Sequence, residues 1–306
     1  MNKPLVSIVI PTKDRLEDIK KLLLSINNSK YKNYEIIIIN NGNNDLSLDI
    51  STEKVQVINN KFNVGLAKAR NQGAKLSKGK YVLFIDDDNI IDKDLLKNLV
   101  DSFESNPEFI AVGPLTKYWG NKKKIWFVNA EYSFLTTRFT IVKSLKKVSL
   151  YKKRFVYTDN LHNCLMIPKE LGDKVGWFDE KLFMSGTEFD LLQRLRTLKP
   201  SGVLVTDISA ISYHNIPLPS KKGVRHLGIS YPFRAFYLQR NRAVLLKRYG
   251  NFFYVLILGL ITYPLFFLFY TYRFIRAKRL DLVIANFKGV LAGYIFLFFN
   301  KLCAVY

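Results

Sequence analysis

The sequence has few cysteines and lacks the common phosphate-binding fingerprints. Cys164 and Cys303 are its only cysteines, which excludes a disulfide framework or a Cys-rich zinc cluster and favours a reducing, intracellular setting. No charged-then-apolar leader precedes the first predicted strand near Leu5, so no secretory signal is expected. The sequence contains neither GxGxxG nor a GxxxxGKS/T loop, which argues against a nicotinamide enzyme or an ATPase.

Acidic residues are almost missing from two basic stretches. Residues 117–158 contain eleven Lys/Arg and a single acid, Glu131, and residues 208–280 contain twelve Lys/Arg and no acid. These stretches account for the whole formal net charge of +22 in the 306-residue chain. Such concentrated positive charge favours a polyanionic partner, either nucleic acid or an anionic membrane surface.

Apolar runs of strand length alternate with helical patterns along the first 115 residues. Strands that are apolar throughout indicate an α/β fold with a mainly parallel sheet, covered by helices on both faces. The predicted strands are 6–10, 34–40, 55–58, 81–85 and 109–114, and helical spacing occurs within 14–26, 63–74 and 92–105. Later segments with the same signals are the strands 163–167, 203–206 and 208–213 and the helix 188–198.

Three consecutive aspartates, Asp86, Asp87 and Asp88, follow the apolar strand at 81–85. Adjacent carboxylates repel one another, so they are costly unless a cation lies among them or water surrounds them. The stretch is therefore either a solvated acidic turn or a site where Mg²⁺ or Mn²⁺ holds substrate phosphates. Ligands of parallel sheets bind outside the carboxyl ends of the strands. Other polar residues at such predicted ends favour the ligand site, namely Asp14, Asn40 and Asn41.

Five segments in order resemble family 2 of the glycosyltransferases. They are VSIVIPTKDR at 6–15, NVGLAKARNQG at 63–73, FIDDD at 84–88, VGWFDEKLFMSGTEFDLLQRLR at 175–196 and YHN at 213–215. The resemblance covers about residues 4–245 and is strongest to rhamnosyltransferase-like and mannosyltransferase-like members. It implies an inverting, metal-dependent enzyme with a GT-A fold, a Rossmann-like sheet, that takes a hexosyl residue from a nucleoside diphosphate sugar.

The resemblance places the donor site at the ends of the first strands. By similarity, the nucleotide sugar is bound by Pro11, Thr12, Asp14, Asn41, Arg70, Asp86 and Asp87. Asn41 stands where the family usually has a carboxylate that reads the base. Arg15 is either a further contact or an exposed charge at a helix start, and Arg70 either supports the pocket or forms a salt bridge within its helix.

The resemblance also implies a metal site. Asp86 and Asp88 match the family's DxD motif, and His214 takes the place of a third ligand of Mn²⁺ or Mg²⁺. Such a metal neutralises the charge that builds on the departing nucleoside diphosphate. In many relatives a later basic segment closes over the donor, here with Lys221, Lys222 and Arg225.

The segment Gly186–Asp190 resembles the acidic block that precedes a helix in the family. Glu188 takes the place of the general base, and Asp190 is the runner-up. A base is needed because a sugar hydroxyl is a poor nucleophile until its proton is removed. The structural alternative for both carboxylates is capping of the helix N-terminus. Arg240 and Asn241 resemble a late Arg–Asn pair of the family, to which the sequence assigns no role.

The C-terminal part contains long apolar segments. Residues 252–272 form 21 residues without a charge, which is long enough to span a bilayer. The segment 287–299 is shorter and includes Lys288. An interfacial or re-entrant hairpin with its flanking Lys/Arg on the cytoplasmic leaflet satisfies the charges best, and a two-span hairpin or a buried core helix are the alternatives. These apolar segments next to the basic residues favour a membrane over nucleic acid as the anionic partner.

We therefore predict four consecutive regions. They are a nucleotide-sugar-binding half (1–115), a basic, aromatic and irregular insert that is a lobe or mobile loop (116–160), an acceptor-side half (161–248) and membrane-associated helices (249–306). The predicted function is hexosyl transfer at the cytoplasmic face of the cell membrane to a hydroxyl of a glycan, carried on a polyprenyl lipid. The alternative is a catalytically silent GT-A-like protein that binds membranes and partners.

Overall fold

The computed structural model describes residues 3–46, 54–217, 229 and 231–303, and the chain forms two compact units. The sheet unit consists of Met1–Glu131, Ile141–Glu180 and Leu191–Pro217. The helical unit consists of Tyr132–Thr140, Lys181–Asp190 and Leu218–Tyr306. The units therefore interleave along the sequence, whereas the predicted regions follow one another.

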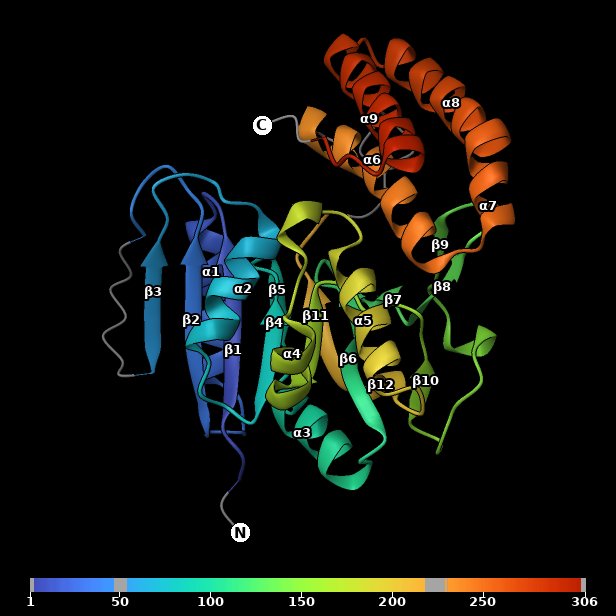
Figure 1. Ribbon diagram of the computed structural model, residues 1–306. Helices are drawn as coiled ribbons and strands as arrows, with labels where there is room; N and C mark the ends of the chain where they lie inside the picture. Colours follow the sequence, from blue (N-terminus) through green and yellow to red (C-terminus); the bar gives the residue numbers. More distant parts are fainter. Residues whose placement is uncertain (1–2, 47–53, 218–228, 230, 304–306) are drawn as a thin grey trace. The chain divides into compact units, whose positions relative to one another are not determined.

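The sheet unit is built on one mixed sheet of ten strands. The strands are β1 (Val6–Thr12), β2 (Tyr34–Asn40), β3 (Val55–Asn59), β4 (Tyr81–Ile85), β5 (Asn89–Ile91), β6 (Phe109–Tyr118), β7 (Asn121–Phe127), β10 (Phe155–Tyr157), β11 (Cys164–Pro168) and β12 (Val203–His214). Their order is β10-β12-β6-β11-β4-β1-β2-β3, with β5 beside β12 and β7 beside β6 (Figure 1). Strands β3, β2, β1 and β4 run parallel, whereas β11 is antiparallel to both β4 and β6.

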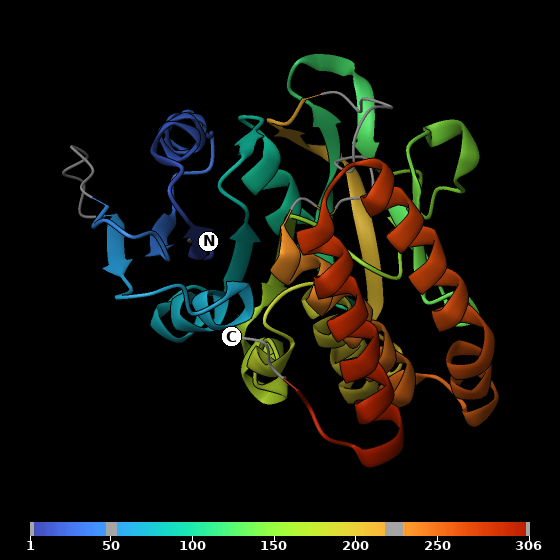
Figure 2. The same cartoon turned by 90° about the horizontal axis from the view of Figure 1, so that it is seen from above.

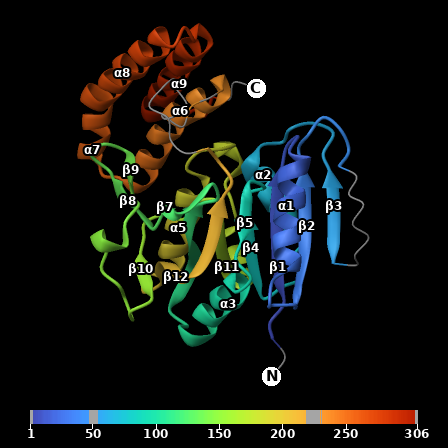
Figure 3. The ribbon, with the colours of Figure 1, turned by 180° about the vertical axis from the view of Figure 1, so that it is seen from behind.

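Helices cover both faces of this sheet, as predicted. They are α1 (Leu16–Asn27), α2 (Leu66–Leu76), α3 (Leu95–Ser105) and α4 (Lys169–Val175). Figure 2 shows α1 and α3 on one face and α2 and α4 on the other. Accordingly, α2 lies in front of the sheet in Figure 1, and α1 lies in front in the view from behind in Figure 3.

Successive side chains of the buried strands point to opposite faces of the sheet, which explains why helices pack on both faces. Ile8 and Ile10 share one apolar cluster with α1 and α3, because side chains two residues apart point to the same face. Val9 points to the opposite face and meets α2 at Gly73, where an added Cβ would lie 2.2 Å from Val9 Cγ1. The absence of a side chain at Gly73 therefore lets α2 pack closely on the sheet.

The predicted insert at 116–160 contains more regular structure than its irregular sequence pattern indicated. β6 continues to Tyr118 and β7 returns antiparallel to it, β8 (Asn129–Ser133) pairs with β9 (Arg138–Val142), and β10 joins the edge of the large sheet at β12. The three central lysines of β7, Lys122 to Lys124, are all exposed. Their run of charges hides the alternation by which a strand is recognised in a sequence.

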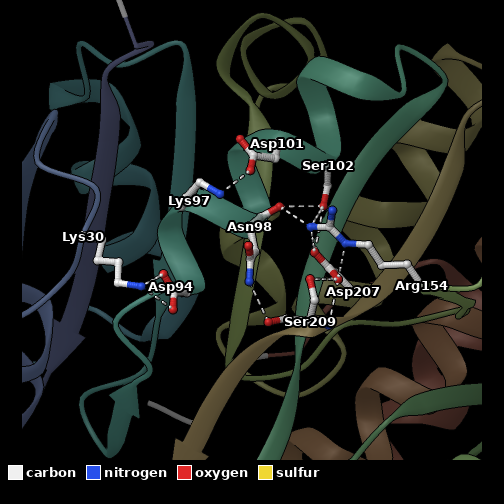
Figure 4. Close-up of polar contacts among 9 residues, drawn as sticks. All are labelled: Lys30, Asp94, Lys97, Asn98, Asp101, Ser102, Arg154, Asp207 and Ser209. Carbon is white, nitrogen blue, oxygen red and sulfur yellow. Dashed lines mark hydrogen bonds and ion pairs between the residues drawn. The ribbon is translucent and has the colours of Figure 1, made fainter.

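Arg154 anchors the end of this insert to the sheet unit. Its guanidinium donates to both carboxylate oxygens of Asp207, from Nε at 2.9 Å and from Nη2 at 2.6 Å. The same Nη2 donates to the carbonyl oxygen of Asn98 in α3 at 2.9 Å. Figure 4 shows the guanidinium between Asp207 and α3. Since Asp207 is fully buried, this ion pair neutralises a carboxylate that would otherwise be costly inside the sheet unit.

The C-terminal part of the helical unit is made of helices. They are α6 (Pro232–Tyr249), α7 (Phe252–Ile257), the π-helical turn η4 (Leu258–Thr262), α8 (Tyr263–Arg276) and α9 (Leu280–Phe299). Of these elements, α7, η4 and α8 join into one continuous helix, Phe252–Arg276. The π turn directly precedes Pro264, which cannot donate a backbone hydrogen bond, and such turns accommodate an interrupted bonding pattern.

The second apolar segment is longer than predicted. Helix α9 has 20 residues and begins at Leu280, because Lys288 lies on its exposed side and does not interrupt it. Both Phe252–Arg276 and Leu280–Phe299 are long and apolar enough to cross a membrane by length and composition. Within the apolar windows of these helices, 17% of the first and 50% of the second is buried. The first helix is thus far more exposed than a core helix of a soluble domain.

Candidate functional site

The candidate donor site lies at the end of β4. Asp86, Asp87 and Asp88 follow this strand, and β5 comes directly after them. β5 pairs antiparallel with the end of β12, which places His214 opposite Asn89. The backbone N–H of Asn215 also donates to the carbonyl oxygen of Asp88 at 2.7 Å. This pairing brings the YHN segment beside the aspartates, although more than a hundred residues separate them in the sequence.

Asp88 lies between two cationic or potentially cationic groups. Its Oδ1 is 3.2 Å from His214 Nε2, and its Oδ2 accepts a hydrogen bond from Arg15 Nη1 at 2.8 Å. Burial alone would raise the pKa of Asp88, but the contacts with His214 and Arg15 outweigh it and lower the pKa to about 2. Asp88 is therefore ionised at neutral pH despite being largely buried.

Asp87 points to the interior of the site. Its Oδ2 accepts from Thr12 Oγ1 at 2.7 Å, and its Oδ1 accepts from Arg15 Nη1 at 3.1 Å. Burial raises the pKa of Asp87 to about 7, against the lowering influence of Arg15 and Thr12. Thr12, predicted to contact the nucleotide sugar, holds this carboxylate with its hydroxyl.

Arg70 supports the first aspartate. Its side chain is fully buried, and its Nη2 donates to Asp86 Oδ1 at 2.8 Å. The guanidinium also lies 5.2 Å from the centre of the Phe178 ring, a distance typical of a cation–π contact. Arg70 thus pairs with an aspartate at a strand end, and this pair is not a salt bridge within α2.

Pro11, Asp14 and Asn41 lie at the neighbouring ends of β1 and β2. Pro11 is buried inside β1, opposite Ile39. Asp14 adopts a φ of 56° and accepts a hydrogen bond at Oδ1 from the backbone N–H of Asn43 at 3.2 Å. Asn41 is buried, and its Oδ1 accepts from Asn60 Nδ2 at 2.9 Å. The polar side chains here join the loops that follow β2 and β3.

The donor set at Asp88 and His214 fits a divalent metal. Within the described ranges, Asp88 Oδ1 and His214 Nδ1 are buried without a hydrogen-bond partner, which is unusual for buried polar atoms. Carboxylate oxygen and imidazole nitrogen are suitable ligands for Mn²⁺ or Mg²⁺. No group of three or more His, Cys, Asp or Glu among the described residues could hold a metal. Further ligands would therefore be phosphate oxygens and water.

An aromatic side chain lies against His214, one of the candidate metal ligands. The indole ring of Trp126, in β7, contacts the imidazole of His214 edge-to-face, with ring centroids 4.5 Å apart. Trp126 also contacts His162, with ring centroids 6.3 Å apart. This contact could not be predicted from the sequence, because it depends on the pairing of β7 with β6. The contacts of Arg15 with Asp87 and Asp88 were likewise not predicted, because the sequence left Arg15 as either a contact of the nucleotide sugar or an exposed charge at a helix start.

The two candidate bases belong to the helical unit, where they begin α5 (Thr187–Leu198). Asp190 is fully buried, and its Oδ1 accepts from Arg248 Nη1 at 2.7 Å and from the Tyr249 hydroxyl at 2.8 Å. Glu188 is half-buried, and its Oε2 accepts from Thr187 Oγ1 at 2.9 Å. Of the two carboxylates, only Glu188 retains solvent exposure. Lys221, Lys222 and Arg225 lie outside the described residues.

Comparison with protein families gives a match over half of the chain. The model described as "Glycosyl transferase family 2" matches residues 7–166. An uncharacterized glycosyltransferase of Haemophilus influenzae is 33% identical over 118 residues, 37% of this chain and 36% of that protein. The first three curated relatives are matched over only 36% to 62% of their own length. A glucosyl-dolichyl phosphate glucuronosyltransferase of Haloferax volcanii is 26% identical over 61% of this chain and 72% of that protein.

Solved structures share the fold. A crystal structure of GalNAc-T7 with UDP, GalNAc and Mn²⁺ has a TM-score of 0.62 at 17% identity, over 82% of this chain and 50% of that one. The mannosyltransferase PcManGT of Pyrobaculum calidifontis, in complex with GDP-Man and Mn²⁺, has a TM-score of 0.50 at 15% identity. That match covers 95% of this chain and 88% of the other. The predicted GT-A fold with long apolar C-terminal helices is thereby confirmed.

Proposed function

We propose that this chain, which belongs to glycosyl transferase family 2, transfers a hexosyl residue from a nucleoside diphosphate sugar to a hydroxyl of a glycan, with inversion at the anomeric carbon. The observation that carries the proposal is the pair of Asp88 and His214, in which the largely buried Asp88 Oδ1 lies 3.2 Å from His214 Nε2. Asp88 follows β4 and His214 ends β12, and folds of this kind bind nucleotides at the carboxyl ends of their parallel strands.

Asp88 and His214 would hold Mn²⁺ or Mg²⁺ through Oδ1 and Nε2, which lie 3.2 Å apart. When bound, the ion supplies Lewis-acid stabilisation of the leaving diphosphate. GalNAc-T7 and PcManGT were both solved with Mn²⁺, which supports this choice of cofactor. Asp86, the third predicted ligand, accepts a hydrogen bond from Arg70 Nη2 and would instead orient the ribose of the donor.

Arg15 is the second positive group of the donor site. Its Nη1 bridges Asp87 and Asp88, and its side chain remains 48% exposed. Burial would lower the pKa of Arg15, but the carboxylates outweigh it and raise the pKa. A guanidinium that is charged, exposed and directed to the aspartates is suited to bind phosphate oxygens.

Glu188 is the base that the contacts favour. Asp190 Oδ1 accepts hydrogen bonds from Arg248 Nη1 and the Tyr249 hydroxyl, and the residue is fully buried, so an acceptor hydroxyl has no access to its carboxylate. Glu188 is half-buried at the start of the same helix. In the proposed step, Glu188 takes the proton of the acceptor hydroxyl while that oxygen attacks the anomeric carbon on the face opposite the departing diphosphate.

A membrane-bound acceptor is supported by the helical unit. Phe252–Arg276 is apolar over most of its length and largely exposed. Basic residues gather at its end and directly after it, namely Arg273, Arg276, Lys278 and Arg279. Such a combination suits an anionic bilayer surface. The Haloferax relative is named for a dolichyl phosphate-linked substrate. We therefore extend the proposal to a polyprenyl-lipid-linked glycan at the cytoplasmic face of the membrane.

The proposal is tested by incubating the full chain, in membranes, with a panel of radiolabelled nucleoside diphosphate sugars and Mn²⁺. We expect one donor to label the fraction extracted by organic solvent, and chelation of the metal to abolish the labelling. Labelling of a water-soluble glycan would retain the enzyme but overturn the lipid carrier. Metal-dependent UDP or GDP binding without transfer from any donor would favour the catalytically silent alternative.

A further inference from the structure

The loop that precedes the candidate base has an unfavourable backbone. Phe183 and Ser185 adopt left-handed φ angles of 60° and 64°, and Gly186 follows with a φ of 82°. Residues other than glycine rarely take this conformation, because Cβ approaches the carbonyl oxygen. Such a backbone persists only where its surroundings hold it in place. Glu188 lies two residues after Gly186, so whatever holds this loop also sets the start of α5.

Asn241 provides that support from α6. Its side-chain amide donates to three carbonyl oxygens of the loop, those of Leu182 at 2.9 Å, Met184 at 2.7 Å and Ser185 at 2.9 Å. Asn241 is 1% exposed, so water does not compete for these bonds. One side chain thereby satisfies the carbonyl groups on both sides of the left-handed Phe183.

Arg240 orients this amide. Its Nε and Nη2 donate to Asn241 Oδ1 at 2.9 and 2.7 Å, which turns the amide nitrogen of Asn241 to the loop. The same Nη2 donates to the carbonyl oxygen of Lys181 at 2.6 Å. Nη1 donates to the carbonyl oxygen of Cys303, beyond the end of α9, at 2.8 Å. Arg240 is 1% exposed and lies 4.6 Å from the centre of the Tyr237 ring.

We propose that Arg240 and Asn241 are positioning residues for the glycosyl-transfer step: they hold the loop 181–186 in its left-handed conformation and thereby place Glu188 at the acceptor hydroxyl. This inference rests on the proposed function, in which Glu188 is the base. Both side chains are 1% exposed, so their effect on the reaction would pass through Glu188. Arg240 also donates to the carbonyl oxygens of Lys181 and Cys303, so it joins the loop before the base to the segment that follows α9.

Packing against α6 limits the alternatives open to the loop. A Cβ added at Gly186 would lie 2.6 Å from Leu245 Cδ1, so the loop runs close to α6 at this point. The neighbouring Phe189 is buried in one apolar cluster with Val244 and Leu245. Apolar contacts hold the helix, but they do not satisfy the loop carbonyl groups. Those depend on the Arg240–Asn241 pair.

The test uses Asn241→Asp in the full chain. This change keeps the shape and the acceptor for Arg240, but it places an oxygen against three carbonyl oxygens. We expect kcat to fall by about 100-fold, as for a displacement of a catalytic group by about 1 Å, with KM and Kd for the donor unchanged. Backbone amides of residues 182–188 should exchange hydrogen faster than in the wild type. The milder Arg240→Lys should give a smaller loss of kcat.

Lys247→Met is the matched control. Lys247 also lies on α6 and donates to two carbonyl oxygens, but these belong to Phe296 and Leu297 of α9. We expect its kcat and the exchange of 182–188 to stay within twofold of the wild type. If Asn241→Asp fails to fold, Asn241→Ala removes the bonds without the repulsion and is read in the same way.

Two outcomes separate this inference from the proposed function. If Asn241→Asp keeps wild-type kcat and wild-type exchange at 182–188, Arg240 and Asn241 do not position the base, and the inference is overturned. If Glu188→Gln retains full transfer, the assigned base is wrong whatever the loop does. Hydrogen exchange does not require turnover, so it decides whether the pair holds the loop even in the absence of transfer.

Discussion

The guanidinium groups of the two units find their acceptors in different ways. In the sheet unit, guanidinium groups meet carboxylates: Arg15 meets Asp87 and Asp88, Arg70 meets Asp86, and Arg154 meets Asp207. In the helical unit, Arg240 donates to Asn241 and to backbone carbonyls, and Arg242 donates to Gln239 and to the Tyr270 hydroxyl.

The difference follows from the supply of acids. The residues assigned to the helical unit include only three, Glu188, Asp190 and Asp281. Asp190 is paired with Arg248, and Asp281 is paired with Arg279. A region so poor in acids is suited to lie against anionic lipid. In such a region a carboxylate is kept where it has a task, and the proposed task of Glu188 is proton abstraction.

In the proposed function, the sheet unit binds the donor and Glu188 of the helical unit abstracts the proton. Of the variants considered, Glu188→Gln should separate these two roles most strongly. We expect transfer to fall by about 10²- to 10⁴-fold, the usual contribution of a general base. Metal-dependent binding of the donor should remain unchanged. Initial rates of labelled-sugar transfer, together with donor Kd, measure both. Loss of donor binding in this variant would contradict the separation.

Asp190→Asn should weaken folding of the helical unit, since it removes the fully buried negative charge that accepts hydrogen bonds from Arg248 and the Tyr249 hydroxyl. Removing one partner of a buried pair costs about 3 kcal/mol. A urea or thermal denaturation series measures the loss. A variant with wild-type stability but no transfer would instead make Asp190 the base.

The same reasoning applies to the ion pair of the sheet unit in Figure 4. Asp207→Asn should destabilise the chain by about 3 kcal/mol, because Arg154 loses a fully buried carboxylate that it binds through two nitrogens. Asp101→Asn is the control: Asp101 pairs with Lys97 at 3.4 Å, and both side chains are about half exposed. Exposed pairs of this kind contribute at most about 1 kcal/mol. Equal losses in the two variants would refute a special role for the buried pair.

The smallest expected effect is on lipid binding, which should depend on charges of the helical unit and not on charges of the sheet unit. Arg273→Gln with Arg276→Gln removes two charges from the end of α8. We expect weaker binding to phosphatidylserine vesicles by about 1 kcal/mol per charge, and a smaller effect as salt rises. Lys20→Gln, which removes an exposed charge of α1 in the sheet unit, should have no effect in vesicle sedimentation. An equal effect of Lys20→Gln would contradict a membrane-facing helical unit.

Local signals in the sequence carried most of the fold. Three of the buried strands are almost wholly apolar, namely β1, β2 and β4. Two of the helices, α1 and α3, repeat their apolar residues at helical spacing. These strands and helices were therefore predicted from local patterns. β5, β7 and β10 were missed, because they are short or highly charged and are stabilised by distant partners. Such strands leave little local signal.

The candidate site was predicted less completely than the fold. Runs of residues such as Asp86–Asp88 mark a site by their composition. The contacts of Trp126 with His214, and of Arg15 with two aspartates, arise only when distant segments meet. The role of Asn241 likewise became visible only through its bonds to the loop before α5. The residue type alone does not distinguish a positioning amide from a polar residue in a helix.

Calorimetric titration of UDP and GDP, with and without Mn²⁺, tests the central claim most directly, because it separates donor binding from proton abstraction. The wild type and Glu188→Gln should bind one of these nucleotides with the same Mn²⁺-dependent Kd. Asp88→Asn should lose the Mn²⁺-dependent part, since Asp88 Oδ1 is the proposed ligand beside His214. An unchanged Mn²⁺ dependence in Asp88→Asn, or its loss in Glu188→Gln, would contradict the assignment of the donor site to the sheet unit and of the base to the helical unit.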